Sequence, residues 1–236
     1  MTEYPVRVPP RIPPYLDDPV FYADMIDAIG RGARVLADTP TGVMLRTPGR
    51  AIQLTAADAD STDELLDHLD GPVRLLVAHD EHSVPVVQRR FGFERATPCY
   101  SSVFEGTDLA PVTLPGVRIE PLGPEWAQVV ADNYHPDDLR YAVNRLEAGV
   151  MLGAFRGDTL LGFIGQHSEG AMGLLDVLPE YRHHGIATVL LTRLTHDLLA
   201  AGRVPYDHII VGNEPSEQLQ RKLGFTISTR ILYWMS

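Results

Sequence analysis

The sequence of 236 residues contains a single cysteine, Cys99. One cysteine excludes a disulfide within the chain and any metal site built from several cysteines. Cys99 has no partner motif that would make it a nucleophile, so we expect a small buried apolar residue there. Runs of 18 or more apolar residues are also missing, and the sequence therefore predicts no membrane-spanning helix.

Positive charge is scarce as well. The sequence has 20 Lys and Arg against 31 Asp and Glu, a net charge of −11 at pH 7. An acidic balance disfavours nucleic acid as a partner and favours solubility. The first residues, MTEYPVRVPPRIPPYLDD, lack the apolar core and the cleavage site of a signal peptide. We expect a cytoplasmic protein with neither nucleic acid nor membrane as a partner.

Two halves of the sequence end alike. The stretch 108–121, DLAPVTLPGVRIEP, holds three prolines without a helical period and predicts a linker that runs into a strand. Segment 83–94, SVPVVQRRFGFE, resembles segment 216–227, SEQLQRKLGFTI, with one residue inserted in the first. The similarity predicts a degenerate duplication. The predicted first copy spans residues 1–107, the linker 108–116 and the second copy 117–236.

Apolar periodicity and turn residues predict the elements of each half. For the first half we expect a hairpin at 37–42, helices near 19–29 and 62–69, and strands at 51–54 and 73–78. For the second half we expect helices near 124–133 and 136–148, and strands at 150–155, 159–166 and 172–177. Gly157-Asp158 predicts a tight hairpin between the first two of these strands.

The stretch LDVLPEYRHHGIATVLL, residues 175–191, predicts a strand, a turn and a helix. Pro179 cannot donate to a sheet ladder and ends the strand. Apolar residues at helical spacing then form a core-facing stripe to about residue 201, and Gly202 suits the end of the helix. The helix therefore begins close to Gly185.

A helix beginning at this turn predicts an anion site, because its first N–H groups and the positive end of its dipole face the turn. Gly185 allows a phosphate to approach the backbone, and Ala187 keeps the first helical turn small. Arg182 can add a charge-assisted hydrogen bond. The sequence predicts that the turn binds a pyrophosphate.

A second signature, VGNEPSEQLQRKLGF at 211–225, follows the helix. Together with Arg-x-x-Gly-x-Ala, it resembles the GNAT superfamily of acyl-CoA-dependent N-acyltransferases over residues 115–236. The residues of the two motifs are most similar to those of the glycine N-acyltransferase-like branch. The resemblance implies an α/β fold, the α+β mixed sheet of GNAT proteins, here with a degenerate N-terminal copy. It also implies acetyl-CoA or another acyl-CoA as co-substrate and no metal.

The resemblance also assigns residues. Strand 172–177 would splay from strand 208–212 to admit the thioester, and the N–H of Val177 would face the thioester carbonyl. The residues implied to contact CoA are Val177, Leu178, Arg182, His183, His184, Gly185, Ile186, Ala187, Asn213, Ser216 and Gln220.

Amide formation also requires groups that move protons. We rank Asp176 first and Glu169 second as the base that takes the amine proton, with His167 near Glu169. Many relatives have a tyrosine at the position of Gln220, which protonates the CoA thiolate. Glutamine cannot supply that proton, so solvent or another group, Tyr206 or Tyr233 among them, would do so.

Several other residues have two interpretations. His183 and His184 lack further ligands for a metal and are expected to be phosphate donors or solvated residues. Lys222 is expected on a solvated helix face, with a contact to the CoA 3′-phosphate as the alternative. Arg140, Tyr141 and Arg145 could meet an acceptor carboxylate or lie at the surface.

The leading hypothesis is acyl transfer, by default acetyl transfer, to a primary amine of a small molecule or amino acid. A second enzyme hypothesis is acetylation of a protein N-terminus or lysine. The hypothesis from another class is a catalytically silent acyl-CoA-binding or interaction protein, which the glutamine at position 220 favours.

Overall fold

The computed structural model describes residues 12–134 and 138–236. The N-terminal stretch through Arg11 and the start of the helix expected at Pro136 lie outside these residues. None of the helices in the described ranges is long and apolar enough to cross a membrane.

Eleven strands form one mixed sheet in the described part of the chain, in the order β1-β2-β3-β4-β11-β5-β10-β9-β8-β7-β6. The strands are β1 Arg34–Thr39, β2 Gly42–Arg46, β3 Ile52–Ala56, β4 Leu76–Ala78, β5 Ala96–Val103, β6 Arg118–Pro121, β7 Met151–Arg156, β8 Thr159–Gln166, β9 Met172–Val177, β10 Tyr206–Ile210 and β11 Thr226–Met235. The helices are α1 Ala23–Gly30, α2 Ala59–Leu66, α3 Ser83–Phe91, α4 Ala127–Tyr134, α5 Leu139–Glu147, α6 Ile186–Ala200 and α7 Glu214–Lys222, with short 3₁₀ helices η1 Pro124–Trp126 and η2 Pro179–Tyr181.

The two halves of the chain repeat one pattern of strand pairing. In the first half, β1–β2 and β2–β3 are antiparallel and β3–β4 is parallel. In the second half, β7–β8 and β8–β9 are antiparallel and β9–β10 is parallel. In each half a helix, α3 or α7, then leads through a left-handed glycine, Gly92 or Gly224, toward the last strand. The mixed α/β fold expected from the sequence is confirmed.

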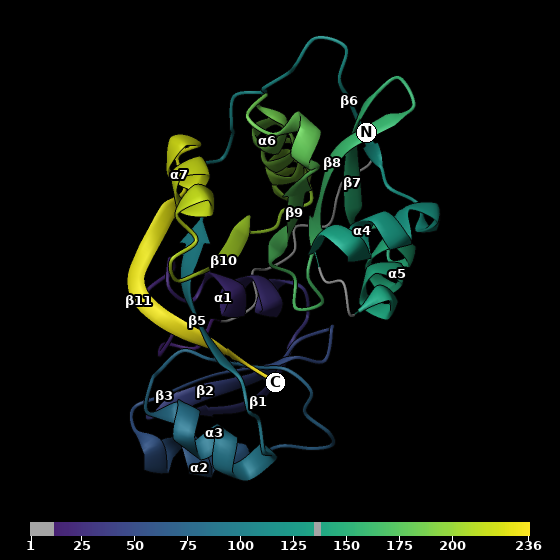
Figure 1. Cartoon of the computed structure of the whole chain (residues 1–236). Coiled ribbons are helices and arrows are strands. Elements are labelled where there is room, and N and C mark those ends of the chain that lie inside the picture. Colours follow the sequence, from purple (N-terminus) through teal and green to yellow (C-terminus); the bar gives the residue numbers. More distant parts are fainter. Residues whose placement is uncertain (1–11, 135–137) are drawn as a thin grey trace, which may run out of the picture.

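The last strands of the two halves are exchanged. β5 of the first half pairs with β10, and β11 of the second half pairs with β4. β5 and β11 also pair with each other, antiparallel, at the centre of the sheet. Figure 1 shows both strands running between the two parts of the molecule. The residue limits of the two copies stay a prediction, but each half completes the sheet of the other.

Helices cover both faces of the sheet in each half. In the second half, α6 packs on one face of β7–β9, and α4 and α5 pack on the other. In the first half, α2 and α3 cover one face and α1 the other. Cys99 belongs to the cluster under α1, where burial raises the pKa of its thiol to about 12. This agrees with a small apolar role for that residue.

Most predicted elements lie close to the observed ones. The strands at 159–166 and 172–177 have the expected limits, and the Gly157-Asp158 hairpin joins β7 to β8. Helix α2 begins three residues earlier than expected, because the Asp58 side chain caps it by accepting from Ser61 N–H. Helix α1 begins at Ala23 rather than near residue 19, because the Asp18 carboxylate holds Val20 and Phe21 in a turn.

Candidate functional site

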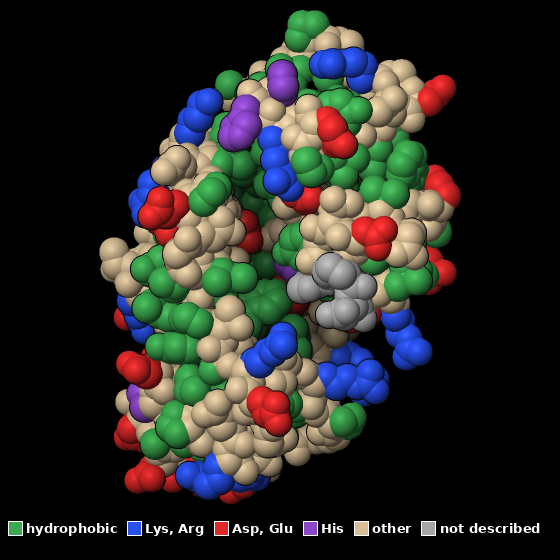
Figure 2. All heavy atoms as spheres, viewed as in Figure 1, with side chains coloured by type: hydrophobic (Ala, Val, Ile, Leu, Met, Phe, Trp, Pro, Cys, Tyr) green, Lys and Arg blue, Asp and Glu red, His purple; other side chains and the backbone are tan. Residues whose placement is uncertain are grey.

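A cleft opens where β9 and β10 diverge. The two parallel strands pair at one position, Met172 with Asp207, and then separate, as expected from the sequence. The space between them has a volume of about 620 Å³ and extends to the start of α6. Figure 2 shows a hollow with apolar side chains on the face of the molecule seen in Figure 1.

Most of the predicted site residues line this cleft. They are Asp176, Val177, Arg182, His183, Gly185, Ile186, Ala187, Asn213 and Ser216. Lys222 also lines it, and its contact with the CoA 3′-phosphate stays a prediction. Four predicted residues do not line the cleft: Glu169, Leu178, His184 and Gln220.

A β-bulge shapes the wall that β9 gives to the cleft. Phe163 pairs with Asp176 and Gly165 with Gly173, so two residues of β9 lie opposite the single Ile164. One of them, Leu174, has a φ of 49°, the left-handed region that a leucine rarely adopts. Its side chain is buried toward α4 and α5, whereas the next residue, Leu175, packs toward α6.

The backbone of β9 directs a hydrogen-bond donor into the cleft. The N–H of Leu178 donates to the carbonyl of Leu161 in β8, at 2.9 Å. Because successive N–H groups of a strand point in opposite directions, the N–H of Val177 points away from β8, toward the cleft. The donor expected at Val177 is therefore directed to the cleft side of the strand.

The start of α6 is open to an anion. Its N-terminal cap is Gly185, and no side chain caps the helix there. Gly185 has a φ of 81° and His183 one of 63°. A Cβ on Gly185 would meet only the side chain of Leu114, at 3.6 Å, so the left-handed backbone rather than crowding favours glycine. The N–H groups of this turn suit an anion such as a phosphate.

Arg182 binds the end of β9. Its Nε donates to the carbonyl of Val177 at 2.8 Å, and its Nη2 lies 3.3 Å from Asp176 Oδ1. Burial raises the pKa of Asp176, and the Arg182 guanidinium opposes that rise. His184, which does not line the cleft, donates from Nδ1 to the Arg182 carbonyl at 2.7 Å within the turn. Arg182 therefore connects the turn to the strand through contacts that require no ligand.

Glu169, the second candidate base, lies apart from the cleft. It lies in the turn that joins β8 to β9, its side chain is fully buried, and its Oε1 has no hydrogen-bond partner in the described part of the chain. Burial raises the pKa of this carboxyl group to about 7. Its backbone carbonyl accepts from Arg31 and from the hydroxyl of Tyr206. Arg31 comes from the first half, so Glu169 lies where the two halves meet.

Asp207, His208 and Tyr134 also line the cleft and were not among the residues predicted from the sequence. Gln220 Nε2 donates to Asp207 Oδ2, and burial raises the pKa of Asp207 to about 7. Gln220 itself is buried behind this carboxylate. The available signal was the pair of polar residues inside the apolar strand YDHII, which places ionisable groups on both faces of β10.

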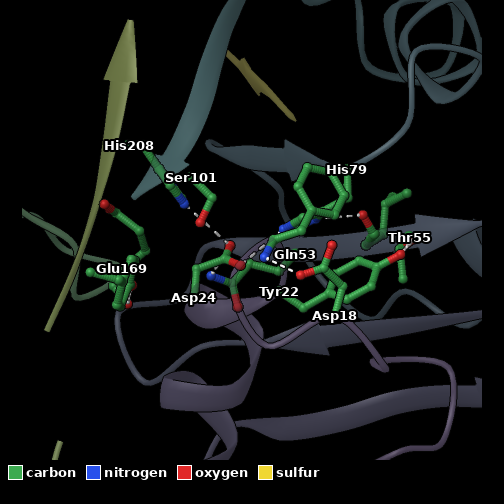
Figure 3. A network of polar contacts seen from close by, with 12 residues as sticks. Asp18, Tyr22, Asp24, Gln53, Thr55, His79, Ser101, Glu169 and His208 are labelled. Carbon is green, nitrogen blue, oxygen red and sulfur yellow. Dashed lines mark hydrogen bonds and ion pairs between the residues drawn. The ribbon is translucent and has the colours of Figure 1, made fainter. Parts of the chain in front are cut away.

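His208 connects the cleft to the first half. Its Nδ1 accepts a hydrogen bond of 2.8 Å from Trp234 Nε1, and its Nε2 lies 3.8 Å from Asp24 Oδ2. Asp24 also accepts from His79 Nε2 at 2.9 Å and from Gln53 Nε2 at 2.8 Å. Figure 3 shows Asp24 between His79 and Gln53 on one side and His208 on the other. Burial lowers the pKa of His208 to about 4, so its ring is neutral at pH 7.

Tyrosines near the cleft are engaged in other contacts. Tyr134 and Tyr141 contact the His167 ring, with Tyr141 Oη 2.7 Å from His167 Nδ1. Burial raises the pKa of Tyr134 to about 12. Tyr206 and Tyr233, which the sequence offered as proton donors, do not line the cleft. Tyr141 packs inward, whereas Arg140 is exposed and Arg145 is half-buried.

The corresponding region of the first half is closed. β3 and β4 pair at three successive positions instead of one. Asp80 Oδ2 then joins their ends by accepting from Thr55 Oγ1 at 2.7 Å and from Ala56 N–H at 3.0 Å. The N-terminus of α2 carries its own carboxylate, Asp58. Neither the opening between strands nor the free helix start of the second half is present here.

No group of three or more His, Cys, Asp or Glu side chains in residues 12–134 and 138–236 is arranged to hold a metal ion. His183 and His184 are exposed in the turn.

Comparisons with known proteins give one family match and several structures of similar fold. The family model described as FR47-like protein matches residues 151–235. The sequence matches no curated protein. A solved structure of a Drosophila protein superposes with a TM-score of 0.64 at 19% identity, over 82% of this chain and 73% of that chain.

Two further structures carry names from one superfamily. A GCN5-related N-acetyltransferase-like protein from Streptococcus suis has a TM-score of 0.55 at 14% identity, over 92% of this chain and 95% of that chain. An acetyltransferase of the GNAT family from Colwellia psychrerythraea has a TM-score of 0.51 at 15% identity, over 84% and 82%. At these identities the likeness concerns the fold. The chain therefore has the GNAT fold, and the half of it that contains the cleft matches the FR47-like protein family.

Proposed function

We propose that the protein transfers an acyl group, by default acetyl, from acyl-CoA to a primary amine of a small molecule or amino acid. The observation that carries this proposal is the cleft between the diverging strands β9 and β10, which ends at the uncapped helix start of α6. A ligand with a pyrophosphate at one end and a long neutral arm fits this combination. The FR47-like match over residues 151–235 supports the same assignment.

The length of β9 supports a proposed position for each part of the donor. The pyrophosphate binds at the turn, residues 182–187, and the arm runs along β9 toward the closed end at Met172. A strand rises roughly 3.3 Å per residue, so Val177 lies well over 10 Å from that end. We therefore propose that its N–H binds the arm beside the turn, and not the thioester carbonyl that the resemblance implied. The thioester reaches the bulge, where the backbone of Leu175 is the nearest donor for its carbonyl oxygen.

Transfer then proceeds by direct attack of the amine in a ternary complex. Asp176 is the proposed base, because it lines the cleft. It pairs with Phe163 of β8, which faces α4 and α5, so the Asp176 side chain lies on the same face of the sheet. The acceptor therefore approaches from that side. Glu169 stays the second candidate for the base, with a buried side chain that does not line the cleft. The sequence similarity of the two motifs supports the glycine N-acyltransferase-like branch, in which the acceptor is an amino acid.

The first test is CoA binding by the variant Gly185→Glu. A glutamate there adds volume and negative charge at the phosphate position, so the affinity for CoA measured by calorimetry should fall at least about tenfold. Gly202→Glu is the matched control, since Gly202 also has a left-handed backbone (φ 67°) with open space around it, at the other end of α6. Equal CoA affinity in the Gly185 variant and the parent would show that the pyrophosphate lies elsewhere.

A second test separates an enzyme from a silent binding protein. Thiol release is followed with acetyl-CoA and a panel of amines, amino acids and N-terminal peptides, with products identified by mass spectrometry. The enzyme proposal predicts release that depends on the acceptor. The silent alternative is favoured by the buried amide of Gln220, which cannot donate a proton to CoA. Tight CoA binding without turnover of any acceptor would support that alternative.

A further inference from the structure

Asp207 occupies the closed end of the cleft. It is the residue of β10 that pairs with Met172, the last point of contact before the strands diverge. Its side chain points toward α7, where Gln220 binds it, whereas the next residue of β10, His208, points to the other face, toward Asp24. An acyl-CoA that follows β9 from the turn brings its sulfur toward this end. Asp207 is then the carboxyl group on the α6–α7 side of that sulfur.

The surroundings of Asp207 favour its protonated form. Gln220 is a neutral donor, and no Lys, Arg or His in the described part of the chain forms an ion pair with Asp207. Asp176, the other carboxyl group of the cleft, differs because Arg182 neutralises it. Gln220 contacts Oδ2, which leaves Oδ1 as the oxygen that carries the proton. Burial raises the pKa of Asp207 to about 7, close to the range in which a general acid works best at neutral pH.

We propose that Asp207, held in place by Gln220, is the acid that protonates the CoA thiolate. The proposal rests on the proposed acyl transfer. When the amine nitrogen bonds to the thioester carbon, the C–S bond breaks and sulfur leaves with its electron pair. Oδ1–H of Asp207 gives its proton to sulfur, which yields CoA thiol and the Asp207 carboxylate. Solvent returns a proton to Asp207, and the proton lost by the amine passes to its base and then to solvent.

Other groups of the cleft are less suited to this step. His208 is neutral, and both of its ring nitrogens face protein groups, Trp234 and Asp24. The Tyr134 hydroxyl contacts His167 and has a pKa of about 12. Gln220 cannot release a proton. Its amide serves instead as a positioning group for Asp207.

The first experiment needs no turnover. The carboxyl carbon of Asp207 is titrated by carbon-13 NMR in the full-length protein, with Asp207→Asn used to assign the signal. Addition of CoA should shift this signal and its midpoint, because the thiol lies against the carboxyl group. Desulfo-CoA, which lacks the sulfur atom, should not. An Asp207 signal that is ionised throughout pH 5–8, or that responds equally to both ligands, would overturn the proposal.

The second experiment compares turnover of the parent and Asp207→Asn. The asparagine keeps the size and a hydrogen bond to Gln220, so we expect KM for acyl-CoA to stay within about twofold and kcat to fall about 10²-fold at pH 6. Asp197→Asn, an exposed aspartate on α6, is the matched control and should leave kcat unchanged. The ratio of the parent kcat to the Asp207→Asn kcat should shrink about tenfold between pH 6 and pH 8, as the parent loses the proton.

The two proposals fail in different ways. If the parent transfers acyl groups and Asp207→Asn retains its kcat and pH profile, the acid assignment is wrong while the acyl transfer stands. If no acceptor is turned over but CoA alone shifts the Asp207 signal, the acyl transfer is wrong while the sulfur is still located at Asp207. A ratio of kcat values that does not change with pH would assign Asp207 a structural role.

Discussion

At the scale of single residues, three carboxyl groups in the second half share a raised pKa and one cause, burial, but differ in their contacts. Asp176 has a cation, Asp207 has a neutral amide, and Glu169 has an oxygen without a partner in the described residues. Removing a charge from water is costly unless another group compensates it. Asp176 is thus the group most easily kept ionised, as a base requires, and Asp207 the one most easily kept protonated at the cleft.

Glu169 makes the stability of the protein depend on pH. Its folded pKa of about 7 exceeds that of an unfolded glutamate, so the folded state holds the proton more tightly. The free energy of unfolding should therefore fall as the pH rises from about 4.5 to about 7, by up to about 3 kcal/mol. The variant Glu169→Gln should not show this fall in the free energy of unfolding, because glutamine does not titrate. Urea unfolding at pH 4.5 and pH 8 should show the variant gaining on the parent at the higher pH, whereas Glu64→Gln at an exposed position should not. A difference independent of pH would contradict the assignment.

At the scale of elements, β9, η2 and α6 act as one unit that Arg182 holds together. The guanidinium binds the carbonyl of Val177 and the carboxylate of Asp176, both at the end of the strand. It was expected to bind phosphate, and the structure gives it a contact that does not need a ligand. The geometry of the anion site thus depends on a side chain that fixes the turn.

We expect Arg182→Gln to act on both ends of this unit. The loss of the cation should raise the pKa of Asp176 further, since Arg182 now lowers it, and move the acidic limb of the pH–rate profile to higher pH. CoA affinity should fall several-fold, because the turn loses its bond to the strand. Arg193→Gln, an exposed arginine of α6 paired with Asp197, is the control. If the acidic limb does not move, the base is not Asp176.

This unit could be predicted from the sequence because its signals are local. Pro179, Gly185 and the apolar stripe of α6 lie within thirty residues of one another, and each fixes the backbone near itself. The bulge at Leu174 could not be predicted, since a leucine in a left-handed conformation has no local signature. The role of Asp207 could not be predicted either. It depends on Gln220 thirteen residues away and on β5, which comes from the first half of the chain.

At the scale of the whole molecule, the first half contributes more than a surface to pack against. Asp27 of α1 binds Arg203 with both carboxylate oxygens, at 2.9 and 3.2 Å, and this aspartate is almost fully buried. Asp24 lies against His208 in the cleft wall, and β5 pairs with the whole length of β10. The closed strands β3 and β4 supply no second cleft. The first half therefore supports the site without repeating it.

Deleting residues 1–107 should leave an aggregation-prone fragment that does not bind CoA. Without β5, β10 retains its single pairing with β9, and a buried sheet edge becomes exposed. Solubility and CoA calorimetry of residues 108–236 test this. Co-expression with residues 1–107 is the control and should restore a soluble complex, because each fragment carries a strand that the other needs. A soluble 108–236 fragment that binds CoA as tightly as the full chain would show that the halves are independent.

The exchange of β5 and β11 also determines the order in which the molecule can fold during translation. β5 is synthesised before any of its partners, β10 and β11, and β4 must wait for β11, which is translated after every other strand. Such distant pairings make folding slow and leave unpaired edges exposed in the meantime. The first half cannot finish folding as it leaves the ribosome. Shielding of the waiting β4 and β5 edges by a chaperone would therefore matter most during the synthesis of residues 117–235.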